Sequence, residues 1–150
     1  MNRLLLAAAT VASIATALPA AAQFAKPEQA IKYRQSAMAL QANHLGRLFA
    51  MANGKVPFEA KVAAEQIEIV AMLNKLQFAA FVDGSDKGDT RAKPEIWSQR
   101  DKFNAREAKS HEDVAKLVAA GKTGDFEQIK AAVGAVGQSC KGCHDEFRKE

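Results

Sequence analysis

The sequence predicts an all-α protein that folds as an antiparallel up-down-up-down four-helix bundle. Three observations support this prediction. Apolar residues recur at alternating steps of three and four along four long segments, which is the period of an amphipathic helix. Proline stands at the front of three of these segments, where a missing backbone N–H costs nothing. Short connections between segments of about 25 residues favour antiparallel neighbours.

The first two helices are expected at residues 27–52 and at about 57–81, beginning at Pro27 and Pro57. Because the apolar arc of the second helix is wide, this helix is also suited to contact a partner. The predicted inward stripe of the first helix contains Ile31, Gln35, Met38, Ala42, Leu45 and Phe49. The second stripe contains Phe58, Val62, Ile69, Leu73, Leu76 and Ala80, with Ile67, Val70 and Phe78 beside it.

Residues 82–93 are rich in Gly and Asp and predict a loop. A third helix is expected from Pro94 to about Ala120, with a stripe that Arg100 and Glu107 interrupt. Two glycines, Gly121 and Gly124, are then expected to end it and to open the next turn.

The last helix begins with the letters DFEQ, in which Asp125 is placed to cap the helix and Gln128 to complete a capping box. Its apolar positions follow an unbroken rhythm of three and four. Both cysteines are therefore predicted to lie on its buried side. The positions are Phe126, Ile129, Val133, Val136, Cys140, Cys143 and Phe147.

The first 22 residues have the pattern of a secretory signal peptide. Arg3 is followed by an apolar run through Leu18 and then by small residues, of which Ala20 and Ala22 fit a small-x-small cleavage rule. We therefore expect a cleaved signal at residues 1–22, a single domain at residues 23–150, and no membrane anchor after cleavage. The formal charge of +4 is small and mixed along the chain, which excludes nucleic acid as an expected partner.

The chain has only two cysteines, in the motif Cys140-x-x-Cys143-His144 near its end. This spacing is compatible with a redox dithiol, half of a zinc site, a short disulfide or a covalent haem attachment site. A structural zinc site usually has four protein ligands, and a thioredoxin-like dithiol needs a βαβ setting. Export and an all-helical setting favour haem, because both thiols and the imidazole project to one side of a helix. The alternative is a pair of buried free cysteines acting as small hydrophobic residues.

Five stretches carry a resemblance over residues 23–150: AKPEQAIKYRQSAMAL, GKVPFEAKVAA, GSDKGDT, KPEIW and VGQSCKGCHDEFR. Through them the chain resembles the cytochrome c prime family, the four-helix class II c-type cytochromes, whose bundle topology is well established. The resemblance implies one haem c bound covalently through Cys140 and Cys143. It also implies that His144 is the protein ligand of the iron, and that the protein works in the periplasm.

The resemblance also assigns roles to residues around this haem. Met38 covers the distal face, and we expect five-coordinate high-spin iron with Met38 close by but unbonded; the alternative is a ligating thioether. Arg34 and Gln35 are expected to contact the haem propionates. The loop residue Asp89 is expected at the haem edge. Arg148 shares the face of the iron ligand one turn later and suits the negative end of the helix.

Two functional classes follow from these expectations. The resemblance implies electron transport with redox partner proteins that the sequence does not identify. An open sixth position on the iron would instead permit binding or sequestration of the diatomic gases nitric oxide and carbon monoxide. An enzyme is not expected, because no acid/base constellation accompanies the motif. A homodimer through the first two helices is the family expectation.

Overall fold

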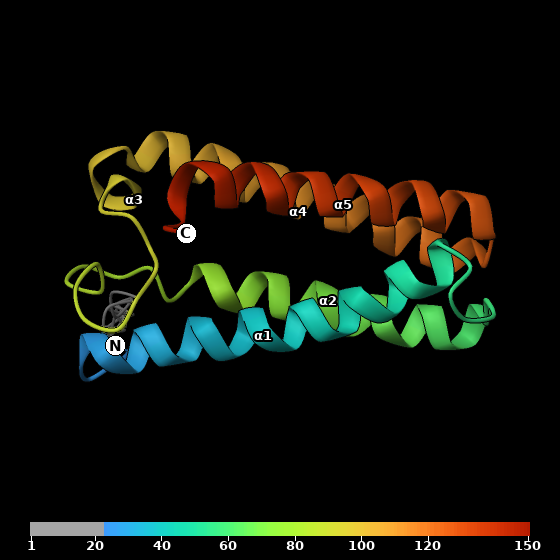
Figure 1. The fold of residues 1–150 in the computed structure, drawn as a ribbon, viewed down its shortest axis with the longest axis horizontal. Helices are drawn as coiled ribbons and strands as arrows, with labels where there is room; N and C mark the ends of the chain where they lie inside the picture. Colours follow the sequence, from blue (N-terminus) through green and yellow to red (C-terminus); the bar gives the residue numbers. More distant parts are fainter. Residues whose placement is uncertain (1–22) are drawn as a thin grey trace, which may run out of the picture.

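The computed structural model describes residues 23–150, which fold into a bundle of four long helices (Figure 1). These are α1 (Pro27–Ala52), α2 (Ala60–Phe78), α4 (Arg100–Thr123) and α5 (Phe126–Phe147), with the short α3 (Glu95–Ser98) before α4. Around the bundle, α1 packs against α2 and α5, and α4 packs against the same two helices. The chain runs up, down, up and down, so the predicted fold class is confirmed.

The signal peptide predicted at residues 1–22 lies outside the described residues. Over residues 23–150, none of the helices combines the length and the apolar character that crossing a membrane requires.

The first helix has the predicted bounds, but its buried face is rotated relative to the predicted stripe. Gln35 and Ala42, which we predicted to point inward, are exposed. The rotation follows from two polar residues on the buried face, Arg34 and Gln41, which have partners on α2 and on the loop after it. The buried residues of α1 are Ala30, Ile31, Arg34, Ala37, Gln41, Leu45, Leu48, Met51 and Ala52.

The second helix is shorter than predicted at both ends. It begins at Ala60, because Glu59 keeps an extended backbone with φ −127° and ψ 107°. It ends at Phe78, where the chain turns and the N–H of Phe81 donates to the carbonyl oxygen of Phe78 at 3.2 Å. This turn brings the Phe81 ring into the core.

The predicted third helix is divided in two, so the prediction of one continuous helix was wrong. The break lies at Gln99, with φ −120° and ψ 48°. On either side of it, Trp97 Nε1 donates to the carbonyl oxygen of Val82 at 3.1 Å and Arg100 Nη2 to that of Phe81, also at 3.1 Å. These bonds connect α3 and the first residue of α4 to the turn after α2. Gly124, in the left-handed region with φ 68°, then ends α4 as expected. Gly121 was also expected to end the helix, but it lies inside α4, which continues to Thr123.

The core has two parts along the bundle axis. The aromatic cluster consists of Phe81, Ile96, Phe103 and Phe147 and lies at the end of the bundle that carries α3. The aliphatic cluster fills the rest of the bundle. It consists of Leu45, Leu48, Met51, Ala52, Ala63, Ile67, Val70, Val114, Leu117, Ala120, Ile129, Val133 and Val136.

Candidate cofactor site

The last turns of α5 hold the three residues of the motif. As predicted, Asp125 caps the start of the helix, and its Oδ1 accepts from the N–H of Gln128 at 2.8 Å. Cys140 packs against the aliphatic cluster and Cys143 against the aromatic cluster. Both thiols are half-buried rather than buried, and His144 is exposed. Cys140 and His144 border a groove, which leaves this part of α5 uncovered by another helix. The motif therefore stands where the two parts of the core meet.

The protonation states at the motif suit covalent attachment better than thiol exchange. Burial raises the pKa of the Cys140 thiol, and burial followed by the neighbouring Cys140 raises the pKa of Cys143 to about 11. A reactive dithiol needs a lowered thiol pKa, which these surroundings do not provide. Partial desolvation of the ring, followed by the positive charge of Arg148, lowers the pKa of His144. The imidazole is therefore neutral at pH 7 and has a nitrogen lone pair available.

A groove of about 600 Å³ runs beside the motif between α1 and α5. Leu45 and Phe49 line it from α1, and Cys140 and His144 from α5. The two helices approach closely here because α5 carries Gly137, where an added Cβ would lie 2.6 Å from Cζ of Phe49. The glycine thus permits Phe49 to stand against α5 beside the first cysteine.

Arg34 points into the protein and is only 2% exposed. Its Nη1 donates to the carbonyl oxygen of Ala80 at 3.1 Å and to Ser85 Oγ at 2.7 Å. Its Nη2 donates to the carbonyl oxygen of Ser85 at 2.6 Å and to Thr90 Oγ1 at 2.9 Å. The guanidinium also lies 4.6 Å from the ring centroid of Phe81. Burial lowers the pKa of Arg34 to about 10.

None of the ion pairs formed within residues 23–150 includes Arg34. A buried charge is normally paired, because leaving water costs it several kcal/mol. The structure thus provides a positive charge without a neighbouring carboxylate at the end of the bundle that carries the aromatic cluster. An anionic group of a cofactor would supply the missing counter-charge.

The other predicted contacts from α1 are Gln35 and Met38. Gln35 is exposed, and its Nε2 donates to the backbone carbonyl oxygen of Asp89 at 2.9 Å. The Asp89 side chain itself is exposed. Met38 is half-buried and packs against the aromatic cluster, as Cys143 does. The structure therefore brings Met38 and the motif to the same part of the core. Gln35 and Asp89 instead meet on the exposed surface at the edge of that core.

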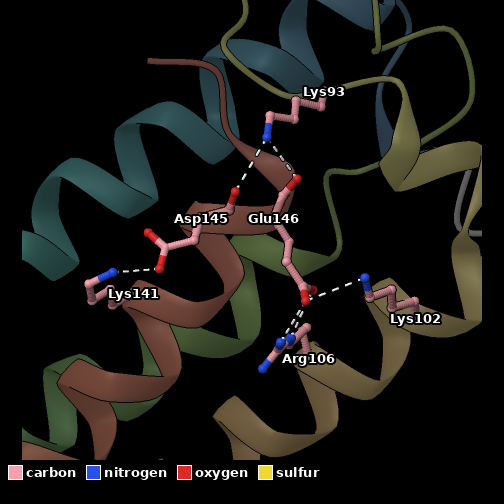
Figure 2. Close-up of polar contacts among 6 residues, drawn as sticks. All are labelled: Lys93, Lys102, Arg106, Lys141, Asp145 and Glu146. Carbon is pink, nitrogen blue, oxygen red and sulfur yellow. Dashed lines mark hydrogen bonds and ion pairs between the residues drawn. The ribbon is translucent and has the colours of Figure 1, made fainter.

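An ion-pair network fixes the end of α5 (Figure 2). Arg106 on α4 donates to both carboxylate oxygens of Glu146, at 3.0 Å from Nε and 2.7 Å from Nη2, and Lys102 lies 3.4 Å from the same carboxylate. These contacts, the Arg106 hydrogen bond first, lower the pKa of Glu146 to about 2. An added Cβ at Gly142 would lie 3.2 Å from Arg106 Nη1. Arg106 therefore lies directly against the middle of the cysteine motif.

The segment before α3 holds the chain beyond α5. Lys93 Nζ donates to the carbonyl oxygens of Asp145 at 3.3 Å and Glu146 at 3.0 Å, which are left free at the helix end (Figure 2). Arg148 is exposed, ends α5, and forms an isolated β-bridge with Ala92. Its backbone is thus fixed one turn after His144, while its side chain faces solvent.

Comparisons with known proteins agree with this geometry. A family model described as Cytochrome C' matches residues 29–148. The chain belongs to the cytochrome c prime family. It is 59% identical over 129 residues to cytochrome c prime of Rubrivivax gelatinosus, covering 85% of this chain and 100% of that protein. The crystal structure of that relative superposes with a TM-score of 0.83 over the same shares of the two chains.

A second solved relative is a nitric oxide complex of a variant cytochrome c prime from Alcaligenes xylosoxidans. It is 43% identical, has a TM-score of 0.80, and the match covers 85% of this chain and 98% of that one. Cytochrome c prime proteins are non-enzymatic haem proteins, so the prediction that the chain is not an enzyme is confirmed by its family. Family membership also implies covalent haem c, and both cysteines stand near the end of the chain as this requires.

The described residues fit such a group. Two thiols and a neutral imidazole stand within two turns of α5, beside a groove and against an aromatic cluster. Arg34 is a buried cation without a carboxylate partner, which suits a propionate. Cys140 and Cys143 would hold the porphyrin, and His144 would hold the iron. The aromatic cluster and Met38 would exclude water from it.

Sequence reasoning missed three features of this region. Ser85 was interpreted as part of a solvent loop, yet it is fully buried against Arg34. Gln41 and Asn74 were not singled out, although both are buried and joined across α1 and α2. The sequence signal that could have revealed them is a polar residue on an otherwise apolar helix face. Gln41 gives this signal one turn after Met38. Arg106 and Glu146 gave no signal, because their pairing joins separate helices.

Proposed function

We propose that the protein is an exported c-type cytochrome in which Cys140 and Cys143 bind haem c covalently and His144 ligates the iron. One observation carries the proposal: two half-buried, protonated thiols and a neutral imidazole share one side of α5, where the two core clusters meet. Cleavage after Ala22 and a periplasmic location of residues 23–150 are part of the same proposal. They are consistent with attachment after export.

Electron transport is the first role that we propose for this site. The bound haem would supply an iron centre that cycles between the ferric and ferrous states. The chain contributes the surroundings. Its aromatic cluster would keep water out, and the buried charge of Arg34 would stabilise a propionate of the haem. The exposed His144 side leaves an edge of the site open for a redox partner protein.

Binding of nitric oxide or carbon monoxide is the alternative role. It is favoured by the nitric oxide complexes of two variants of cytochrome c prime from Alcaligenes xylosoxidans. It also requires five-coordinate, high-spin iron with Met38 adjacent but unbonded. The half-buried Met38 is suited to this, because an unbranched thioether can shift aside at small cost.

A homodimer through α1 and α2 belongs to the proposal as well. Three large apolar side chains of these helices are exposed in the single chain: Leu40 at 53%, Met72 at 60% and Leu76 at 38%. Burying such residues in a second copy would contribute about 25 cal/mol per Å² of apolar surface. Sedimentation at micromolar concentration tests this, and a monomer at all concentrations would contradict it.

The optical absorption spectrum of the purified exported protein tests the site. We expect a haem spectrum that persists in denaturant, because the attachment is covalent. A broad high-spin spectrum after reduction with dithionite, changed by nitric oxide, would support an open sixth position. A sharp low-spin spectrum that does not change when the gas is added would leave electron transport as the remaining role. It would also make Met38 the sixth ligand. A colourless protein would contradict the whole proposal.

A further inference from the structure

The end of α5 is paired with a separate piece of chain, the 91–93 segment, which lies just before α3. The N–H of Lys93 donates to the carbonyl oxygen of Phe147 at 2.9 Å, and the N–H of Lys149 donates to that of Arg91 at 2.8 Å. Arg91 Nε donates in turn to the carbonyl oxygen of Lys149 at 3.0 Å. The backbone at the end of α5 is thus held from outside the helix.

The Lys93 side chain reaches the helix itself. Its Nζ lies 3.0 Å from the carbonyl oxygen of Glu146 and 3.3 Å from that of Asp145 (Figure 2). These carbonyl groups belong to the last turn, where the helix has no later N–H to donate to them. An ammonium group at this place satisfies them and also opposes the negative end of the helix dipole. Lys93 is therefore a C-terminal cap of α5 that a separate segment supplies.

The segment that carries this cap is itself fixed by the interior. The N–H of Ala92 donates to Thr90 Oγ1 at 3.1 Å, and the same oxygen accepts from Arg34 Nη2 at 2.9 Å. Ala92 also packs against the aromatic cluster. On the other side, the carbonyl oxygen of Lys93 accepts from the N–H of Ile96, a buried member of that cluster, at 3.2 Å. The cap therefore has a firm support on both sides.

His144 stands three residues before the end of α5, within the turn that Lys93 caps. Its side chain is exposed, so packing orients the ring less than it would orient a buried one. The carbonyl oxygen of His144 accepts from the N–H of Arg148 at 3.0 Å, which closes the helix. Helix ends fray, and fraying here would turn the imidazole away from a fixed direction. The direction of the ring therefore depends on how well this turn is held.

We propose that Lys93 is a positioning residue of the iron site: by capping the last turn of α5, it holds His144 in the orientation that a bond to the haem iron requires. This inference rests on the proposed haem site and extends it to a residue of another segment. Groups outside the ligand set commonly orient a metal-ligating histidine, and losing one weakens the hold on the metal. Lys93 would act in this way through the backbone of the helix that carries the ligand.

The first test is the resonance Raman spectrum of the ferrous exported protein, in which the stretching band of the iron–imidazole bond reports on that bond. In Lys93→Met we expect the band at a lower frequency and broader than in the wild type, because a loosened turn lets the ring take several orientations. Lys93→Arg keeps the charge and several N–H donors and should restore the band. If Met38 ligates the iron, the comparison is made in a Met38→Ala background, where the iron is five-coordinate.

Lys102→Met is the matched control. Lys102 lies 3.4 Å from the Glu146 carboxylate, so its loss removes one positive charge beside the same turn of α5. It removes no contact with the backbone of the helix, and Arg106 still holds Glu146. The iron–imidazole band should therefore stay where it is in the wild type.

Hydrogen exchange shows independently whether the cap is lost. It is followed by mass spectrometry on the peptide after His144. Losing one or two hydrogen bonds at the helix end should speed this exchange about five- to thirtyfold in Lys93→Met. Lys102→Met should speed it much less, because it touches only a side chain.

Three results would overturn the inference while leaving the haem site intact. Faster exchange with an unchanged band would mean that Lys93 caps the helix without positioning the ligand. Equal band shifts in Lys93→Met and Lys102→Met would mean that the lost charge alone is responsible. No change in either measurement would mean that the cap does not act on α5 in solution.

Failure of the proposed haem site would be recognised separately. It would show as a wild-type protein with no haem spectrum and no iron–imidazole band, whereas exchange at the end of α5 would still respond to Lys93→Met. That outcome would refute the positioning role together with the haem site, and leave only the helix cap.

Discussion

Arg34 and Ser85 are joined by two hydrogen bonds across 51 residues of sequence, from Nη1 to the serine hydroxyl at 2.7 Å and from Nη2 to its carbonyl oxygen at 2.6 Å. The serine hydroxyl in turn donates to the carbonyl oxygen of Val82 at 2.7 Å. This pair fixes the loop after α2 against the start of α1. It also holds a positive charge inside the protein at the end that carries the aromatic cluster.

Replacing Arg34 by Met is therefore expected to lower the free energy of unfolding by about 2–4 kcal/mol, since buried oxygens of Ala80 and Ser85 lose their donors. Arg34→Lys should recover only part of this, because one ammonium cannot reproduce the planar fork. Urea unfolding of the exported protein measures both. Arg47→Met, at an exposed arginine of the same helix, is the control and should change stability by less than about 0.5 kcal/mol. Equal effects at the two arginines would contradict the structural role of Arg34.

Loss of the amide is expected to cost much more stability at Asn74 than at Gln41. Asn74→Leu leaves Ser110 and Gln77 as buried donors without an acceptor, which should cost about 2–4 kcal/mol of unfolding free energy. Gln41→Met removes an amide that is already unpaired at one end, so stability should change by less than about 1 kcal/mol or rise. Chemical denaturation compares them. A Gln41 variant that loses as much as the Asn74 variant would show that the 3.5 Å bond from Gln41 Nε2 to Asn74 Oδ1 is a strong one.

Two glycines one turn apart on α5 provide a matched test of the close approach to α1. An added Cβ at Gly134 meets nothing within 4 Å, so Gly134→Ala should gain about 0.5–1 kcal/mol from helix propensity. At Gly137 the same Cβ would lie 2.6 Å from the Phe49 ring, which must move out of its place beside Cys140. Gly137→Ala should lose stability despite the same gain in propensity. Thermal unfolding distinguishes the two, and an equal gain at both positions would mean that Phe49 moves freely.

The fold class was predictable because the apolar rhythm of four segments is a local property of the chain. The ends of the helices were less predictable. The break at Gln99 depends on hydrogen bonds from Trp97 and Arg100 to the turn after α2, which no local pattern reveals. The face that α1 buries was also misjudged. A periodic stripe of apolar residues cannot show that Arg34 and Gln41 form hydrogen bonds with other segments of the chain.

The motif at residues 140–144 was predictable for a different reason, since its chemistry is contained in five consecutive residues. Its surroundings come from the whole bundle. The pairing of Arg106 with Glu146 joins residues 40 apart in sequence, and it places a guanidinium against Gly142 in the middle of the motif. Propensity and periodicity carry no information on such a pair, because either side chain alone suits an exposed helix position.

Met38 offers the most direct test of how the distal side is closed. If Met38 only crowds the site, an incoming gas must displace a side chain packed against the aromatic cluster, at a cost of about 1.5–3 kcal/mol. Met38→Ala should then speed carbon monoxide association by about 10- to 100-fold and leave the reduced spectrum high-spin. If Met38 ligates the iron, the same change should instead convert a low-spin spectrum to a high-spin one. Met51→Ala removes another methionine of α1, buried in the aliphatic cluster, and should leave the association rate unchanged. Stopped-flow mixing with carbon monoxide gives the rate, and equal rates in the wild type and Met38→Ala would show that Met38 does not guard the ligand's path.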